Sequence, residues 1–148
     1  MVNKFLSKIT FVIVSYNSGK IIGKCLDCLP KESKIIIIEN ANNEKILNKY
    51  KRKKNISLIC NSLNNGYGAG NNIGIKLTKT QYVFIISPDT FLKKEIFKKI
   101  ESSIKKLKNN FWLIGIENIT NSKFSLIESK YVGGHALVLN LKKFKKKK

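Results

Sequence analysis

Short runs of Ile, Val and Phe alternate along the chain with segments whose apolar residues recur every three or four positions. The runs predict β-strands at residues 9–15, 34–39, 56–60, 81–86, 111–116 and 131–139. The other segments predict four helices. One helix is capped by Ser18 and a second by Asn42 or Asn43; the other two lie at residues 72–77 and 92–107. Strands that alternate with helices of this length predict βαβ units. We therefore expect an α/β fold with a mostly parallel, Rossmann-like sheet and helices on both faces.

Polar residues follow four of the predicted strands. They are Tyr16-Asn17, Glu39-Asn40, residues 64–72, and Ser87-Pro88-Asp89-Thr90. In open parallel sheets, ligands bind outside the carboxyl ends of the strands. The pattern thus predicts that these segments, tens of residues apart, converge on one edge and form a binding site there.

Asp89 directly follows a strand, and Pro88 fixes one backbone angle beside it. A carboxylate in this place can hold Mg²⁺ or Mn²⁺, which proteins bind through one or two carboxylates together with substrate phosphates. The alternative is that Asp89 and Thr90 only begin the next helix, where an acidic side chain is favourable.

Residues 65–72 (Asn-Gly-Tyr-Gly-Ala-Gly-Asn-Asn) allow backbone amides to approach a ligand and place a helix N-terminus beside it. No Gly-Lys-Ser/Thr follows, so the segment is not a Walker A loop. Counted from Gly66, the sixth place is Asn71, where a dinucleotide fingerprint needs glycine. A Rossmann oxidoreductase is therefore a distant alternative, and the segment alone indicates a turn with an anion contact.

The formal net charge of +20 first suggests a nucleic-acid partner. However, all but one of the 29 basic residues are lysine, and only Arg52 can make the bidentate contacts that read guanine. Abundant Lys, Ile and Asn also indicate an A/T-rich coding sequence. We expect peripheral contact with an anionic membrane to explain the charge better, and keep a nucleic-acid-binding module as an alternative.

Cys25, Cys28 and Cys60 form an odd set, which indicates a reducing compartment rather than a disulfide framework. Cys25 and Cys28 make a C-x-x-C near the end of a predicted helix, whereas a redox pair gains its low pKa at a helix N-terminus. We therefore expect buried thiols. No apolar run reaches the roughly 18 residues of a membrane span, and residues 1–8 are too short and polar for a secretory signal. These features predict a cytosolic protein.

The four polar segments together resemble the family 2 glycosyltransferases, in particular rhamnosyltransferase-like members that build bacterial surface polysaccharides. The resemblance runs from about residue 9 to residue 141. Residues 14–18 look like the family's opening strand and turn, and residues 39–44 are similar to its Asp-Asn-x-Ser-x-Asp element. Residues 65–74 match its Asn-x-Gly…Asn-x-Gly stretch, and Ser-Pro-Asp-Thr looks like its Asn-Pro-Asp-Thr, a variant of the metal-binding Asp-x-Asp motif.

This resemblance implies a GT-A fold, a UDP- or dTDP-sugar donor, Mg²⁺ or Mn²⁺ at the pyrophosphate, and inverting transfer to a saccharide or lipid-linked saccharide acceptor. It implies that Glu39 contacts the base and that Asp89 holds the metal. The other donor-binding residues it implies are Ser15, Tyr16, Asn17, Asn40, Asn65, Gly66, Gly70, Asn71 and Asn72. This sequence departs from the family in three places: Glu39 replaces Asp, Asn42 replaces Ser, and Ser87 replaces the first metal-side residue.

Family members continue past the strand at 131–139 into an acidic cluster that supplies the general base. Here the sequence ends with lysine-rich residues 142–148, and no acid follows Glu128. His135, the only histidine, can titrate, but its Gly-Gly-His-Ala setting is typical of acceptor-side lining. We expect one donor-binding domain over residues 1–141, a tail over 142–148, and a truncated form with little or no activity alone. Alternatively, a partner chain supplies the base.

Overall fold

The computed structural model describes residues 4–116, 129 and 131–144. In this part of the chain, six strands form one sheet in the order β3-β2-β1-β4-β6-β5. They are β1 (Ile9–Ser15), β2 (Lys34–Glu39), β3 (Ile56–Cys60), β4 (Tyr82–Ile86), β5 (Leu113–Gly115) and β6 (Ala136–Asn140). Strands β1 to β4 are parallel, whereas β6 runs antiparallel to both β4 and β5. The predicted α/β class with a mostly parallel sheet is confirmed.

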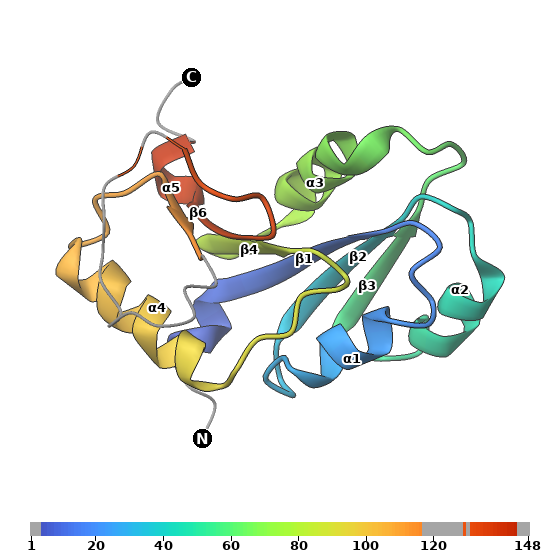
Figure 1. Ribbon diagram of the computed structural model, residues 1–148, viewed down its shortest axis with the longest axis horizontal. Helices are drawn as coiled ribbons and strands as arrows, with labels where there is room; N and C mark the ends of the chain where they lie inside the picture. The colour runs from blue at the N-terminus through green and yellow to red at the C-terminus, as the bar shows by residue number, and fades with distance from the viewer. Residues whose placement is uncertain (1–3, 117–128, 130, 145–148) are drawn as a thin grey trace.

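Helices cover both faces of the sheet (Figure 1). Their bounds are η1 (Leu6–Lys8, a 3₁₀ turn), α1 (Ile22–Asp27), α2 (Glu44–Tyr50), α3 (Gly66–Leu77), α4 (Glu95–Lys106) and α5 (Leu141–Phe144). Helices α1, α2 and α4 lie on one face, and α3 lies on the other. No helix in the described ranges is long and apolar enough to cross a membrane.

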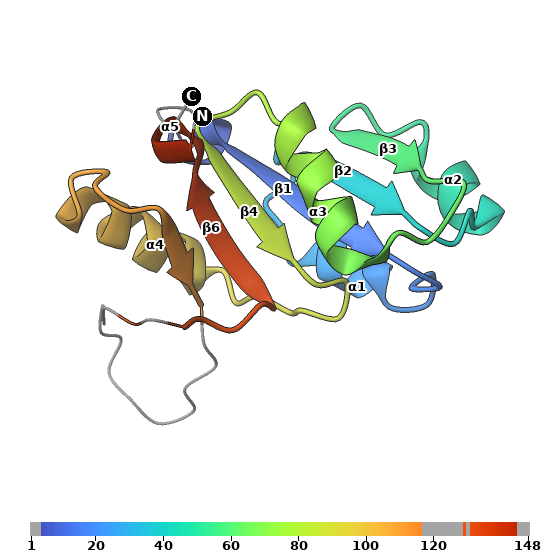
Figure 2. The same ribbon diagram turned by 90° about the horizontal axis from the view of Figure 1, so that it is seen from above.

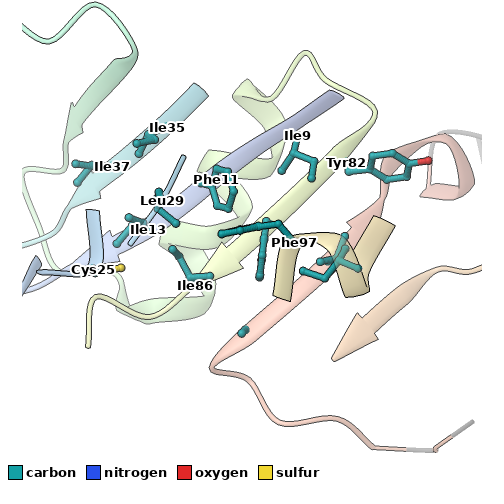
Figure 3. Packing of buried hydrophobic residues seen from close by; sticks show 14 of the residues in the cluster. Ile9, Phe11, Ile13, Cys25, Leu29, Ile35, Ile37, Tyr82, Ile86 and Phe97 are labelled. Atoms are coloured by element: carbon teal, nitrogen blue, oxygen red, sulfur yellow. The ribbon is translucent and has the colours of Figure 1, made fainter. Parts of the chain in front are cut away.

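The central strand β1 contributes alternate residues to two separate cores. Phe11 and Ile13 pack with residues of α1, α2 and α4, including Phe97, whose ring meets Phe11 edge-on at 6.0 Å between centroids (Figure 3). Val12 and Val14 belong to the cluster under α3. Since both faces are covered, every residue of β1 is buried, and the strand is apolar almost throughout, as parallel strands of this kind are.

Two glycines allow α3 to lie close to β1. A Cβ on Gly74 would lie 2.3 Å from Cγ1 of Val12, and a Cβ on Gly70 would lie 2.8 Å from Cγ1 of Val14. Real Cβ atoms do not approach other carbons so closely, so only glycine fits at this helix–sheet contact. Part of the glycine-rich segment is therefore required for packing.

The predicted strands at residues 9–15, 34–39 and 56–60 are confirmed to the residue. Residues 66–72, predicted as a loop before a short helix, are instead the first turns of α3. The last predicted strand was too long: β6 begins at Ala136, because residues 131–135 turn back beside the end of β4.

One of the two predicted helix caps is wrong. The Ser18 hydroxyl donates to the carbonyl of Tyr16 at 3.2 Å, and α1 has no side-chain cap. The second cap is confirmed for Asn43, whose Oδ1 accepts the N–H of Ile46 at 3.4 Å. The proposed boundary after residue 141 stays a prediction, because α5 spans Leu141–Phe144 and residues 145–148 lie outside the described ranges.

Candidate functional site

The structure brings the carboxyl ends of the parallel strands together at one edge of the sheet (Figure 2). The N–H of Asn40, just after β2, donates to the carbonyl of Ser15, the last residue of β1, at 2.8 Å. In turn, the N–H of Asn61, just after β3, donates to the carbonyl of Glu39 at 3.0 Å. Backbone hydrogen bonds thus fix the turns after three neighbouring strands, and the predicted convergence of these segments is confirmed. We call this the carboxyl edge.

Glu39 is a completely buried carboxylate at this edge. Its Oε1 accepts the N–H of Ala41 at 2.9 Å, but its Oε2 has no hydrogen-bond partner among the described residues. Ser15, its registered neighbour on β1, is also fully buried and its hydroxyl oxygen also lacks a described partner. Buried polar atoms without partners are costly. Both atoms therefore keep unused hydrogen-bonding capacity in a buried position at this edge, and contact of either with a ligand stays a prediction.

Tyr16 and Asn17 form the turn after β1. The side chain of Tyr16 is 54% exposed, so its ring is open to contact from solvent. Asn17 adopts a left-handed backbone with φ of 54°, a conformation that asparagine tolerates better than most residues. The turn therefore presents an aromatic face beside the buried Ser15 and Glu39 pair.

The side chain of Asn40 is used within the protein. Its amide donates to Oδ1 of Asn64 and to the carbonyl of Gly66, both at 3.3 Å, and its Oδ1 accepts from the amide of Asn61 at 2.6 Å. Asn40 thus joins the ends of β2 and β3 to the start of α3, which favours a supporting role over direct ligand contact. Asn61 and Asn64 were not among the predicted site residues; the only signal for them is that polar side chains directly follow a strand.

The glycine-rich segment divides into an open side and a packed side. Gly66 has φ of +83°, which glycine adopts without strain, and no atom lies within 4 Å of a Cβ built on Gly66 or on Gly68. The first turn of α3, which follows Asn65, is therefore accessible from the carboxyl edge. Gly70 instead faces Val14, so its predicted ligand contact has no support in this geometry. Its role in binding stays a prediction.

Two neighbouring asparagines of α3 differ in exposure. Asn72 is exposed, whereas Asn71 is buried, and the Oδ1 of Asn71 has no partner among the described residues. A helical neighbour pair lies about 100° apart around the helix axis. Only Asn71 is therefore held close to the sheet, and donor contact by either residue stays a prediction.

The Ser-Pro-Asp-Thr segment after β4 is held by the turn before β6. The N–H of Ser87 and the hydroxyl of Thr90 both donate to the carbonyl of His135, at 3.0 and 3.3 Å. The hydroxyl of Tyr67, in the first turn of α3, donates to the carbonyl of Gly134 at 3.4 Å and lies 3.4 Å from Oγ of Ser87. His135 thus contributes its carbonyl to the site, while its side chain is exposed. Tyr67 was missed by the sequence reasoning, which treated residues 65–72 as backbone.

Asp89 is exposed at the carboxyl edge and lies well before Glu95, where α4 begins. The alternative that Asp89 merely starts the next helix is therefore wrong. Across the described residues, no three or more His, Cys, Asp or Glu side chains are grouped as a metal site. One exposed carboxylate fits a Mg²⁺ or Mn²⁺ ion whose remaining ligands come from substrate phosphates and water.

Cys25 of α1 contacts the Ser-Pro-Asp-Thr segment. It is fully buried, and its thiol donates to the carbonyl of Ser87 at 3.6 Å. Burial raises the pKa of this thiol to about 12, with smaller contributions from Cys28 and Asp89. All three cysteines are free, and Cys60 is exposed. The predicted burial of the C-x-x-C thiols is confirmed for Cys25, whereas Cys28 is only partly buried.

We expect a disulfide reagent at pH 8 to modify Cys60 in the folded chain and Cys25 only after unfolding, because the Cys25 thiol stays protonated and inaccessible. Since its folded pKa lies above the ordinary 9.0, the proton-linked stability is complete below pH 9 and is lost as pH rises toward 12. Mass mapping of labelled peptides, with and without denaturant, tests this. Rapid labelling of Cys25 in the native chain would contradict it.

The chain belongs to glycosyl transferase family 2, because the sequence model of that family matches residues 10–141. The predicted resemblance to this family is confirmed. Among curated relatives, the poly(ribitol-phosphate) β-glucosyltransferase of Bacillus spizizenii is 30% identical over an alignment of 148 positions. The alignment covers 84% of this chain and 23% of that protein.

Solved structures show the same fold. S. aureus TarS 1-349 matches with a TM-score of 0.69 at 17% identity, over 94% of this chain and 48% of that one. The mannosyltransferase PcManGT from Pyrobaculum calidifontis, solved in complex with GDP-Man and Mn²⁺, matches with a TM-score of 0.71 at 9% identity, over 94% of this chain and 46% of that one. The GT-A fold is thus confirmed, and the chain spans less than half the length of these relatives.

Proposed function

We propose that this chain forms the donor site of a glycosyltransferase that takes a nucleoside-diphosphate sugar and transfers the sugar, with inversion, to a saccharide-containing acceptor. The observation that carries the proposal is the pair of buried, unpartnered oxygens of Glu39 and Ser15 at the carboxyl edge. Family membership supplies the reaction class. Consistent with this donor class, S. aureus TarS 1-349 has been solved in complex with UDP-GlcNAc and with UDP.

The nucleoside is proposed to bind beside the turn after β1. Oε2 of Glu39 can accept the N–H of a pyrimidine base, while Oε1 stays bonded to Ala41. The exposed ring of Tyr16 is available to cover the base or ribose. A UDP- or dTDP-sugar satisfies these groups, because uracil and thymine both present a ring N–H.

The diphosphate is proposed to lie between the first turn of α3 and Asp89. The residues that directly follow the four parallel strands, 16–19, 40–43, 61–65 and 87–92, contain no lysine or arginine; Lys20, Lys93 and Lys94 come after them, just before α1 and α4. The negative charge of the diphosphate is therefore proposed to be compensated by helix N–H groups and by a divalent cation held by Asp89. When bound, Mg²⁺ or Mn²⁺ neutralises the charge that develops on the leaving diphosphate. The hydrogen bonds among Tyr67, Ser87 and Gly134 keep this carboxylate-bearing segment in place.

The acceptor is proposed to be a polyol-phosphate polymer or a lipid-linked saccharide. The name of the 30% identical Bacillus relative specifies poly(ribitol phosphate). We propose that the exposed side chain of His135 lines the acceptor side of the site, since its carbonyl accepts the hydroxyl of Thr90 in the Ser-Pro-Asp-Thr segment. Glu39 is assigned to the donor's base and Asp89 to the metal, so we propose that the general base lies outside residues 1–148 and that these residues alone bind a donor with little or no sugar transfer. A cytosolic location with peripheral membrane contact is part of the proposal.

Isothermal titration of the 148-residue chain with UDP-glucose, UDP-GlcNAc and a dTDP-sugar, with and without Mn²⁺, tests the donor site. We expect at least one donor to bind and Mn²⁺ to strengthen that binding. Absence of metal-dependent binding to all three would refute the donor site. Robust sugar transfer by the same chain would instead refute only the lack of turnover.

Replacing Glu39 with Gln is expected to weaken donor binding by about tenfold or more, because hydrogen bonds to charged acceptors contribute about 1.5–3 kcal/mol. The amide keeps a carbonyl for Ala41 and removes a buried charge, so thermal stability should hold or rise. Glu32→Gln is the matched control, since Glu32 is exposed before β2, at the opposite edge. Equal donor affinity for Glu39→Gln and wild type would contradict the assignment.

A further inference from the structure

The cations of this protein are distributed unevenly between the two edges of the sheet. The loops after β2 and β3 contain no lysine before residue 45 and residue 76 respectively, and those after β1 and β4 contain Lys20, Lys93 and Lys94 near the helix starts, whereas an exposed lysine precedes or begins each of the four parallel strands: Lys8, Lys34, Lys54 and Lys79. These strands run the same way, so their starts lie together at the edge opposite the donor site (Figure 2). We call this the basic edge.

Helix ends add further positive charge to the basic edge. In a sheet with βαβ connections, helix C-termini lie near the starts of the strands, and the helix dipole favours cations there. Helix α4 ends with Lys105 and Lys106, and Lys108 follows; all three are exposed. Glu101 forms an ion pair with Lys105 at 2.8 Å, which leaves Lys106 and Lys108 to add charge to the surface.

An exposed aromatic pair lies at the same edge. Trp112 and Phe144 are 44% and 45% exposed, and their rings meet edge-on at 5.3 Å between centroids. Their position is fixed by two backbone hydrogen bonds: Asn140 to the carbonyl of Trp112, and Leu141 to the carbonyl of Gln81, just before β4. Lys142 and Lys143 of α5 lie beside Phe144 in the sequence. Aromatic rings bordered by lysines are typical of surfaces that bind the headgroup region of a membrane.

We propose that the basic edge is the surface by which this protein docks on an anionic membrane, with Trp112 and Phe144 at headgroup level. The donor site at the carboxyl edge then faces away from the lipid, toward the part of a polymeric or lipid-linked acceptor that extends from the membrane. Charge alone would suit any polyanion. The aromatic pair favours a bilayer, because a polyphosphate chain offers no apolar region to receive it. The inference does not depend on the identity of the donor.

Vesicle binding tests the proposal directly, because Trp112 is the only tryptophan of the chain. The 148-residue chain is mixed with phosphatidylcholine vesicles that contain either no anionic lipid or about 30% phosphatidylglycerol. We expect co-sedimentation and a blue shift of the Trp112 emission with anionic vesicles only, and loss of both in high salt. Phe144→Ser should reduce the blue shift and weaken binding severalfold, with no change in circular dichroism.

Two lysine variants of equal net charge show whether membrane binding depends on the position of the lysines or only on the total charge of the protein. The first replaces Lys79, Lys106, Lys108 and Lys142 with Gln at the basic edge. The second replaces Lys20, Lys93, Lys94 and Lys98, all exposed and outside it. A lysine close to an anionic surface contributes about fivefold to binding. We therefore expect at least a tenfold loss for the first variant and little loss for the second.

Equal losses in the two variants would overturn the proposal, as would binding without a tryptophan shift. Inorganic polyphosphate, a short single-stranded DNA and analytical ultracentrifugation without vesicles are run in parallel. Tight polyanion binding with no vesicle binding would assign the basic edge to a soluble polyanion. Self-association that Phe144→Ser abolishes, again without vesicle binding, would assign the aromatic pair to a second copy. Titration with UDP-sugars of the two lysine variants should show unchanged donor affinity.

Discussion

Replacing Asp89 with Asn is expected to abolish the part of donor affinity that depends on Mn²⁺, with a loss of at least about tenfold when the metal is present. The reason is that Asp89 is the exposed carboxylate of the segment after β4, and among the described residues no group of three or more His, Cys, Asp or Glu side chains offers an alternative metal site. Loss even of a supporting residue around a metal ligand costs about 10- to 100-fold in metal affinity. Affinity measured in EDTA should change little, since the base is proposed to be held by other residues, Glu39 and Tyr16.

The matched control for this change is Asp27→Asn. Asp27 is an exposed acid that ends α1 and is not part of the segment after β4, so the same chemical substitution there should leave both affinities unchanged. Titration calorimetry with the UDP-sugar that binds gives the donor affinity of each of the two variants in Mn²⁺ and in EDTA. If Asp89→Asn keeps the full response to Mn²⁺, then the metal is held elsewhere, and the proposed position of the diphosphate is wrong.

The fold was predictable because its strands leave a strong signal. β1 and β2 are buried on both faces, so their sequences are continuous runs of Ile and Val that end at polar residues. The prediction was less accurate for β5 and β6, on the far side of β4. β5 is only three residues long, and the turn before β6 is set by hydrogen bonds to Ser87 and Thr90, which lie far away in the sequence.

The candidate site was predictable in outline, since strand ends with polar residues meet in any parallel sheet. The roles of individual side chains were not. Asn40 looks like a ligand-binding residue in the sequence, yet its hydrogen bonds go to Asn61, Asn64 and Gly66. The hydroxyl of Tyr67 reaches Gly134 through the approach of α3 to β6. Such partners depend on how helices are placed on the sheet, which no local pattern contains.

The glycines of α3 show most clearly that a local sequence pattern does not reveal the role of an individual residue. Glycines 66, 68, 70 and 74 share one segment, and the sequence gives no reason to treat them differently. In the structure, Gly68 faces open space while Gly74 lies against Val12. Val12 is completely buried in the central strand, and its branched side chain cannot turn aside without a clash. The distance between helix and sheet therefore depends on Gly74, and this distance sets where the first turn of α3 lies relative to the proposed donor site.

Replacing Gly74 with Ala is accordingly expected to destabilise the fold by about 1–3 kcal/mol, the usual cost of an extra methyl group in a packed core. Gly68→Ala, in the same helix, should be neutral or stabilising by up to about 1 kcal/mol, because alanine favours helix and the site is open. Urea unfolding followed by circular dichroism gives both values. Because helix propensity favours alanine at both positions, only a tight contact with Val12 can make the two effects differ in sign. Equal stabilisation by both changes would mean that α3 lies farther from β1, and that the donor site is wider than described.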